Sequence, residues 1–374
     1  MSKKESLFKC RFCGKDLENY FSTGPTYCPY CGGAINPATT AGKPIVDSNI
    51  LTGRALWGTK WSILGVVIGM AALIGLTFVA TFIIIGIFIA QDPATFMSDP
   101  YSFVDDIYNF VSNPYMTALL SVAEIGLIMV PLIYLRKYRK PLRDRFLLLG
   151  WRPYFKDAAP KSRGFKKFGK DFTNALIIAF GLVGMQFLVS LLNDLIWLPF
   201  LPTDFLDNTF SELDASITPQ DPLQLIVLIA AMMFLVGTTE EFLFRGFTQQ
   251  GLEFNLSEGK AWLITSLLFT AVYVIGGLLT VVTLYLFIPY FILSLVFCGI
   301  YTKTKNLNLL ILMHGLYNSL LVTYSYIVNE QLELVSWIFV LGSFVVFGII
   351  GVYFLKKHGI QIIKRTLQPK IDRS

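Results

Sequence analysis

Eight apolar stretches of membrane-spanning length follow one another between residues 61 and 355. Crossing an apolar layer about 30 Å thick takes roughly 20 helical residues, because only a helix satisfies its backbone N–H and C=O groups within one segment. The stretches cover residues 61–90, 116–135, 172–198, 223–244, 261–276, 278–301, 307–328 and 335–355. The sequence therefore predicts an all-α polytopic membrane protein with eight transmembrane helices, the sixth of them bent at Pro289.

The charged residues between these stretches alternate in sign. Loops 91–115 and 199–221 hold four and five acidic residues with no Lys or Arg, whereas segment 136–170 holds thirteen Lys or Arg. Basic loops stay on the cytoplasmic side of a membrane. We therefore expect an integral cell membrane protein with both termini in the cytoplasm. The basic residues that give the net charge of +6 cluster beside the apolar stretches. We therefore expect no nucleic-acid partner, and the lipid bilayer is the predicted partner.

Four of the five cysteines form two CxxCG knuckles near the N-terminus. Cys10 and Cys13 make the first pair, and Cys28 and Cys31 make the second, fourteen residues further on. Two such pairs offer four thiolates to one tetrahedral Zn²⁺, whereas disulfides would need an oxidising compartment. The sequence predicts a structural zinc ribbon without an open coordination position for catalysis.

The predicted organisation has five parts. These are the zinc ribbon at 1–33, a flexible linker at 34–60, the first two transmembrane helices with the basic cytoplasmic loop at 61–170, a transmembrane core at 171–356, and a basic cytoplasmic tail at 357–374.

Ionisable residues inside apolar helices are energetically expensive and point to function. Glu241 and Arg245 are four residues apart and are predicted to pair, which leaves Glu240, about 100° away, free to face a cavity. We expect Glu240 to lie about 5 to 10 Å from the cytoplasmic end of its helix. His314 and Asn318 share a face of the seventh helix, with His314 at a comparable depth, so the two helices are predicted to form one site. A buried charge network that only locks the fourth helix is the alternative.

These residues resemble the motifs of the CAAX protease and bacteriocin-processing (CPBP) family of intramembrane peptidases. Glu240, Glu241 and Arg245 match its motif EExxxR, and His314 with Asn318 match its motif HxxxN, within residues 223–328. The resemblance implies an endopeptidase, a hydrolase that cleaves a membrane-associated or lipidated peptide. It implies that Glu240 activates water, that His314 and Asn318 stabilise the oxyanion, and that Arg245 holds Glu241.

The chain departs from the family pattern at one position. Where the family has FxxxH, this sequence reads Phe269-Thr-Ala-Val-Tyr273. A phenol donates a hydrogen bond but is a poor neutral metal ligand or base. Two functions therefore remain open: a peptidase in which Tyr273 orients water or polarises a carbonyl, and a catalytically silent relative that binds or scaffolds membrane partners. A transporter is less favoured because no inverted repeat is visible. A metal at the membrane site is left open.

Three further residues lie in or near the apolar helices without matching a motif. For Glu124 and Asp194 we expect hydrogen bonds between helices, and for Cys298 a buried reduced thiol.

Overall fold

The computed structural model describes residues 57–91, 101, 107, 113–138, 141–154, 161–197, 199–200, 216–276 and 284–354 of the 374-residue chain. The predicted zinc ribbon, nearly all of the linker, and the C-terminal tail lie outside the described residues. The zinc ribbon with its four cysteine ligands therefore stays a prediction.

The described part of the chain is helical and contains no β-strand. Seven of its helical segments are long and apolar enough to cross a membrane: Thr59–Ile87, Pro114–Tyr138, Gly164–Trp197, Pro222–Asn255, Phe287–Thr304, Leu307–Asn329 and Glu333–Tyr353. The remaining predicted stretch, residues 261–276, is also helical and forms α14 (Glu258–Gly276). The prediction of an all-α polytopic membrane protein is confirmed.

The first two spans are α3 (Thr59–Gln91) and the series α6 (Pro114–Leu120), η2 (Ser121–Glu124) and α7 (Ile125–Leu135). The fourth span consists of α11 (Pro222–Ala231), η4 (Met232–Val236), α12 (Gly237–Glu241), η5 (Phe242–Gln249) and α13 (Gln250–Asn255). The others are α9 (Lys161–Trp197), α16 (Phe287–Thr304), α17 (Leu307–Asn329) and α18 (Glu333–Phe354).

Three helix starts follow directly from local sequence. The side chains of Asn113, Asp221 and Asn306 accept hydrogen bonds from backbone N–H groups of the first turns of α6, α11 and α17. Pro114 and Pro222 take the first helical position, where the missing N–H removes no intrahelical bond. These caps fix the starts of the helices that later contribute Glu124, Glu240 and His314.

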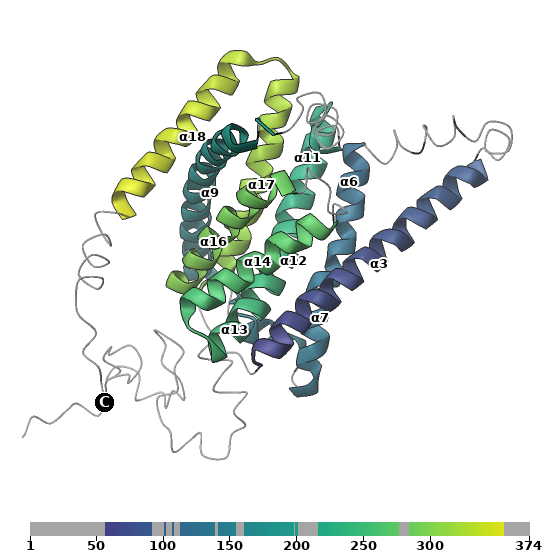
Figure 1. Cartoon of the computed structure of the whole chain (residues 1–374), viewed down its shortest axis with the longest axis vertical. Coiled ribbons are helices and arrows are strands. Elements are labelled where there is room, and N and C mark those ends of the chain that lie inside the picture. Colours follow the sequence, from purple (N-terminus) through teal and green to yellow (C-terminus); the bar gives the residue numbers. More distant parts are fainter. Residues whose placement is uncertain are drawn as a thin grey trace, which may run out of the picture.

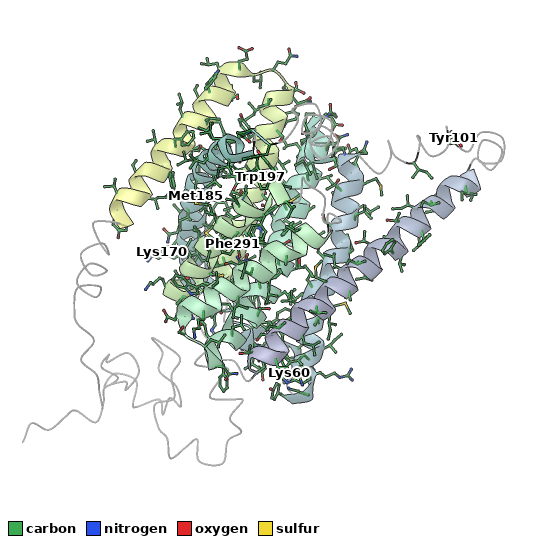
Figure 2. The ribbon with its side chains drawn as sticks, viewed as in Figure 1. Lys60, Tyr101, Lys170, Met185, Trp197 and Phe291 are labelled. Carbon is green, nitrogen blue, oxygen red and sulfur yellow. The ribbon has the colours of Figure 1, made fainter. Side chains whose placement is uncertain are left out.

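Helix α17 lies inside the bundle and packs against α9, α11, η4 and α12 (Figure 1). The helices α3 and α18 lie at opposite edges, and apolar side chains project outward along both (Figure 2). Examples are Phe82 on α3, 69% exposed, and Ile349 on α18, 64% exposed. Apolar surface of this kind is compatible with lipid and not with water.

The fourth span is longer than predicted. Its helical course continues to Asn255, fifteen residues beyond Glu240 or about 22 Å along the axis. Glu240 therefore lies in the middle of the span, and the expected depth of about 5 to 10 Å was wrong. The sequence interpretation ended this helix before Arg245 because polar residues begin there. In the fold several of these side chains are buried and bonded: Gln250 Nε2, for example, donates to Leu149 O at 3.0 Å and to Tyr301 Oη at 2.6 Å.

The predicted sixth helix is interrupted near Pro289, three residues earlier than the expected bend. Residues 284 and 285 are helical, Leu286 is a turn residue, and α16 begins at Phe287, so Pro289 lies in the first turn of α16.

Candidate active site

A close crossing of α12 and α17 brings the candidate residues together. A Cβ atom added to Gly237 would lie 2.6 Å from Gly315 N, and one added to Gly315 would lie 2.8 Å from Met233 Cα. Both separations are shorter than real Cβ contacts, so only glycine allows these backbones to approach so closely. Glu240 follows Gly237 by three residues, and His314 stands immediately before Gly315. The crossing therefore places the side chains of Glu240 and His314 within reach of each other.

Arg245 and Glu241 form a fully buried ion pair. Arg245 Nη1 donates to Glu241 Oε1 at 2.9 Å, and both side chains have no exposed surface. Arg245 Nη2 also donates to Ser294 Oγ at 3.0 Å, and the guanidinium lies 5.0 and 5.1 Å from the ring centroids of Phe269 and Phe297. The predicted pairing of Glu241 with Arg245 is confirmed. Glu241 Oε2 and Arg245 Nε are buried and have no hydrogen-bond partner among the described residues, so the ring contacts and the bond to Ser294 are the further contacts that the guanidinium makes.

The imidazole of His314 connects the two glutamates. Its Nδ1 lies 2.8 Å from Glu241 Oε1, and its Nε2 lies 3.6 Å from Glu240 Oε2. The ring packs edge-on against Phe297, with centroids 5.0 Å apart. Because a carboxylate can only accept, Nδ1 carries the proton of that bond, and Nε2 is the nitrogen that faces Glu240.

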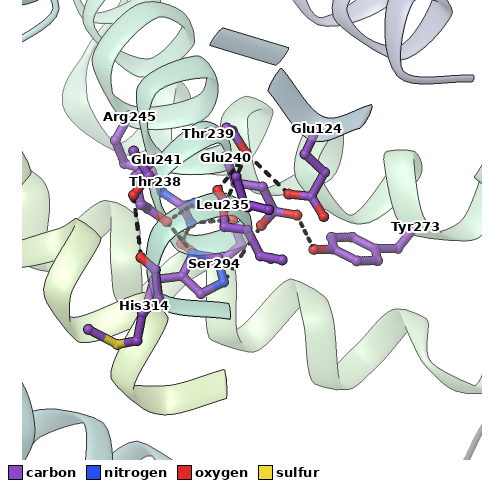
Figure 3. Close-up of polar contacts among 12 residues, drawn as sticks. Glu124, Leu235, Thr238, Thr239, Glu240, Glu241, Arg245, Tyr273, Ser294 and His314 are labelled. Atoms are coloured by element: carbon purple, nitrogen blue, oxygen red, sulfur yellow. Dashed lines mark hydrogen bonds and ion pairs between the residues drawn. The ribbon is translucent and has the colours of Figure 1, made fainter. Parts of the chain in front are cut away.

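Tyr273 contacts Glu240 directly. Its hydroxyl donates to Glu240 Oε1 (Figure 3). Its ring stacks on Tyr290 with centroids 4.4 Å apart and an interplanar angle of 13°. The other carboxyl oxygen, Glu240 Oε2, is buried and accepts no hydrogen bond from the described residues. The phenol at the departure from the family pattern is therefore a hydrogen-bond donor to the candidate base.

Asn318 is the one predicted site residue that stands apart. It is half-buried on α17, one turn beyond His314, and within the described part of the chain it makes no hydrogen bond to the cluster. Its amide shares the His314 face of the helix but does not touch Glu240 or Tyr273.

Three residues of the cluster were not predicted as part of it. Thr239 Oγ1 donates to Glu124 Oε2 at 3.1 Å, which joins the second span to the fourth, and Ser294 accepts from Arg245. The bond confirms the expectation that Glu124 makes contact between helices. A lone carboxyl in an apolar helix pointed to Glu124, whereas no pattern in the sequence singled out Ser294.

The other two expectations are also confirmed. Asp194 accepts a hydrogen bond from Tyr285, and Cys298 is a buried free thiol.

Across the described ranges, no group of three or more His, Cys, Asp or Glu side chains has a geometry that could hold a metal ion. The cluster instead pairs two carboxylates with one guanidinium and one imidazole.

Comparison with known protein families tests the resemblance that the motif residues suggested. Residues 222–320 match the family model of type II CAAX prenyl endopeptidase Rce1-like proteins. This Rce1-like segment runs from the start of α11 into α17 and contains Glu240, Tyr273, His314 and Asn318. It nearly coincides with residues 223–328, on which the resemblance to the CPBP family was predicted, so the family resemblance of this segment is supported. No curated protein and no solved structure matches the chain.

Proposed function

We propose that this protein is an intramembrane endopeptidase of the CAAX prenyl protease type, with Glu240 as its general base. The observation that carries the proposal is the facing pair of Glu240 Oε2 and His314 Nε2, 3.6 Å apart in the middle of the bundle. Glu241 and Arg245 hold the imidazole from its other side. The match of residues 222–320 to the Rce1-like family supports the same reaction class.

The proposed reaction begins with a water molecule bound between Glu240 and His314. Glu240 Oε2 takes one proton from the water as its oxygen attacks the scissile carbonyl carbon. The carbonyl oxygen becomes an oxyanion, which accepts hydrogen bonds from the amide of Asn318 and from Nε2 of His314, a role that requires a proton on both ring nitrogens of His314. The C–N bond then breaks, and the proton on Glu240 passes to the leaving amine. The products are an amine and a carboxylic acid, which keeps the second proton of the water and releases it to solvent to become a carboxylate.

Tyr273 has a positioning role in this proposal. Its hydroxyl donates to Glu240 Oε1 and so leaves Oε2 as the oxygen free to accept the proton from water. A hydrogen bond to a charged acceptor contributes more than one between neutral groups, so the phenol also stabilises the ionised base. This role requires a donor and no metal ligand or second base, which a tyrosine provides as well as a histidine.

The proposed substrate is a peptide held at the membrane, by a lipid group or by an apolar segment. Glu240 lies within the candidate membrane span Pro222–Asn255, so in this proposal the scissile bond reaches it from within the apolar layer. A lipidated C-terminus supplies the apolar surface that brings a short peptide there.

The test uses the full-length protein in lipid nanodiscs and an internally quenched peptide that ends in a farnesylated CAAX motif. We expect cleavage by the wild type and none by Glu240→Gln, which keeps the shape of the side chain but not its basicity. The matched control is Glu258→Gln, an exposed glutamate at the start of α14, and it should cleave at the wild-type rate.

The catalytically silent alternative makes the opposite prediction. It draws on Tyr273, which occupies one oxygen of Glu240. If farnesylated, geranylgeranylated and unmodified peptides are all cleaved no faster by the wild type than by Glu240→Gln, the peptidase assignment is wrong and a scaffold role takes its place.

A further inference from the structure

The second span contributes a carboxyl group that the proposed reaction does not use. Glu124 lies in the middle of the span Pro114–Tyr138, ten residues after its start and fourteen before its end. An ionisable side chain at this depth lowers the stability of an apolar helix unless it has a specific partner. Its presence therefore calls for an account of what it binds.

The partner of Glu124 is the residue next to the proposed base. Thr239 Oγ1 donates to Glu124 Oε2 at 3.1 Å, and Thr239 is 3% exposed. The same hydroxyl lies 2.9 Å from Leu235 O, the carbonyl one turn earlier on its own helix. A hydroxyl has a single proton, so without Glu124 it would bond within the fourth span and would no longer tie that span to the second.

The tie between Thr239 and Glu124 sets the rotation of α12. Successive residues on a helix point about 100° apart, so fixing the direction of one fixes the direction of the next. Figure 3 shows Glu124 reaching Thr239 on the side of the cluster away from His314. By fixing the direction of Thr239, Glu124 keeps the next residue, Glu240, directed toward Tyr273 and His314.

The backbone around α12 is irregular. This five-residue helix lies between two π-helical segments, Met232–Val236 and Phe242–Gln249. π-helical turns depart from the regular i to i+4 hydrogen bonding and are common at functional sites. Side chains contact α12 on two sides: Arg245 and His314 hold Glu241 on one, and Glu124 holds Thr239 on the other.

We propose that Glu124 is a positioning residue for Glu240, acting through the hydroxyl of Thr239. The effect on catalysis rests on the proposed peptidase function, whereas the effect on the position of Glu240 does not.

The first measurement is the rate of cleavage of the farnesylated peptide by full-length variants in nanodiscs. Thr239→Val removes the hydroxyl at constant shape, and Glu124→Leu removes the acceptor. We expect each to lower kcat about ten- to hundredfold with KM nearly unchanged, as for a displaced catalytic group. Thr239→Ser and Glu124→Gln keep a donor and an acceptor, so they should retain most of the wild-type kcat.

Two control variants separate positioning from general damage. Ser121→Ala removes a hydroxyl from the same turn as Glu124, but that hydroxyl bonds only to Thr117 O of its own helix. Thr270→Val removes a fully buried hydroxyl of α14, which bonds to Ser266 O of its own helix. Both should keep the wild-type kcat. Thermal unfolding of all variants, followed by circular dichroism, should give similar midpoints.

The second measurement needs no substrate. Dicyclohexylcarbodiimide is an apolar reagent that modifies protonated carboxyl groups in membranes, and peptide mapping by mass spectrometry reports modification at Glu240 alone. We expect Thr239→Val and Glu124→Leu to change the labelling rate at Glu240 at least several-fold, and the two control variants to leave it unchanged. An unchanged labelling rate in Thr239→Val and Glu124→Leu would overturn the positioning role, whether or not the peptide is cleaved. A changed rate in a protein that cleaves no peptide would overturn only the peptidase function.

Discussion

His314 Nδ1 lies 2.8 Å from Glu241 Oε1, and the same oxygen accepts a hydrogen bond from Arg245 at 2.9 Å. One carboxylate oxygen thus holds both the guanidinium and the imidazole of the cluster. Its neighbour Glu240 has no guanidinium partner and faces the imidazole at 3.6 Å. In the proposed reaction the two adjacent glutamates therefore have different roles: Glu241 holds the imidazole, and Glu240 acts as the base.

Removing the guanidinium should therefore destabilise the protein strongly. Arg245→Leu leaves the Glu241 carboxylate buried without its cation, which lowers the free energy of unfolding by about 3–5 kcal/mol. The double variant Arg245→Leu, Glu241→Leu removes both charges and should recover much of the loss in stability while remaining inactive. Thermal unfolding in detergent, followed by circular dichroism, measures the stability of the single and the double variant. Equal stability of the single and double variants would mean that Glu241 carries no charge.

The glycine crossing should be intolerant of a single methyl group. In Gly315→Ala the new Cβ would lie 2.8 Å from the backbone Cα of Met233, and backbone cannot move aside as a flexible side chain can. We expect a loss of about 1–3 kcal/mol in stability, as for overpacked cores, together with loss of cleavage. Gly348→Ala on α18 is the control, because no atom lies within 4 Å of its added Cβ. A fully active Gly315→Ala variant would contradict the crossing.

Tyr273, which stands where the family pattern has histidine, should contribute to the rate of cleavage through its hydroxyl. Tyr273→Phe keeps the ring stacked on Tyr290 but removes the donor to Glu240, so kcat should fall about ten- to hundredfold, the equivalent of about 1.5–3 kcal/mol. Tyr273→His supplies a different donor and should retain activity. The control is Tyr290→Phe, which keeps the stacked ring and should cleave normally. An unchanged kcat in Tyr273→Phe would show that the phenol is unnecessary.

The predicted zinc ribbon can be tested by elemental analysis. Four thiolates at tetrahedral spacing should give about one zinc ion per purified chain by inductively coupled plasma mass spectrometry. The variant Cys10→Ser, Cys13→Ser should lose the ion, because two ligands do not retain zinc. Cys298→Ser, which changes a buried thiol in the bundle, should keep it. Zinc-free wild-type protein, purified without chelator, would argue against the ribbon.

Much of the membrane body could be read from the sequence. The apolar stretches predicted where the described helices lie, because hydropathy acts over a segment of about 20 residues and needs no knowledge of neighbours. The pairing of Glu241 with Arg245 was equally predictable, since residues four apart on one helix meet whatever surrounds them. Residue types and spacings also pointed to Glu240, Tyr273 and His314 as candidates.

Other features depended on the tertiary structure. The fourth span continues past Arg245, and side chains such as Arg245, Gln249 and Gln250 donate there to partners on α16, which a pattern within one helix cannot reveal. The hydrogen bonds from Thr239 to Glu124 and from Tyr273 to Glu240 join residues 115 and 33 positions apart. The first joins the fourth span to the second, and the other joins the fourth span to α14, so each depends on how these helices pack. Local sequence determines which segments become helices, but the rotation and crossing of those helices decide which side chains share a site, and these follow from packing across the whole bundle.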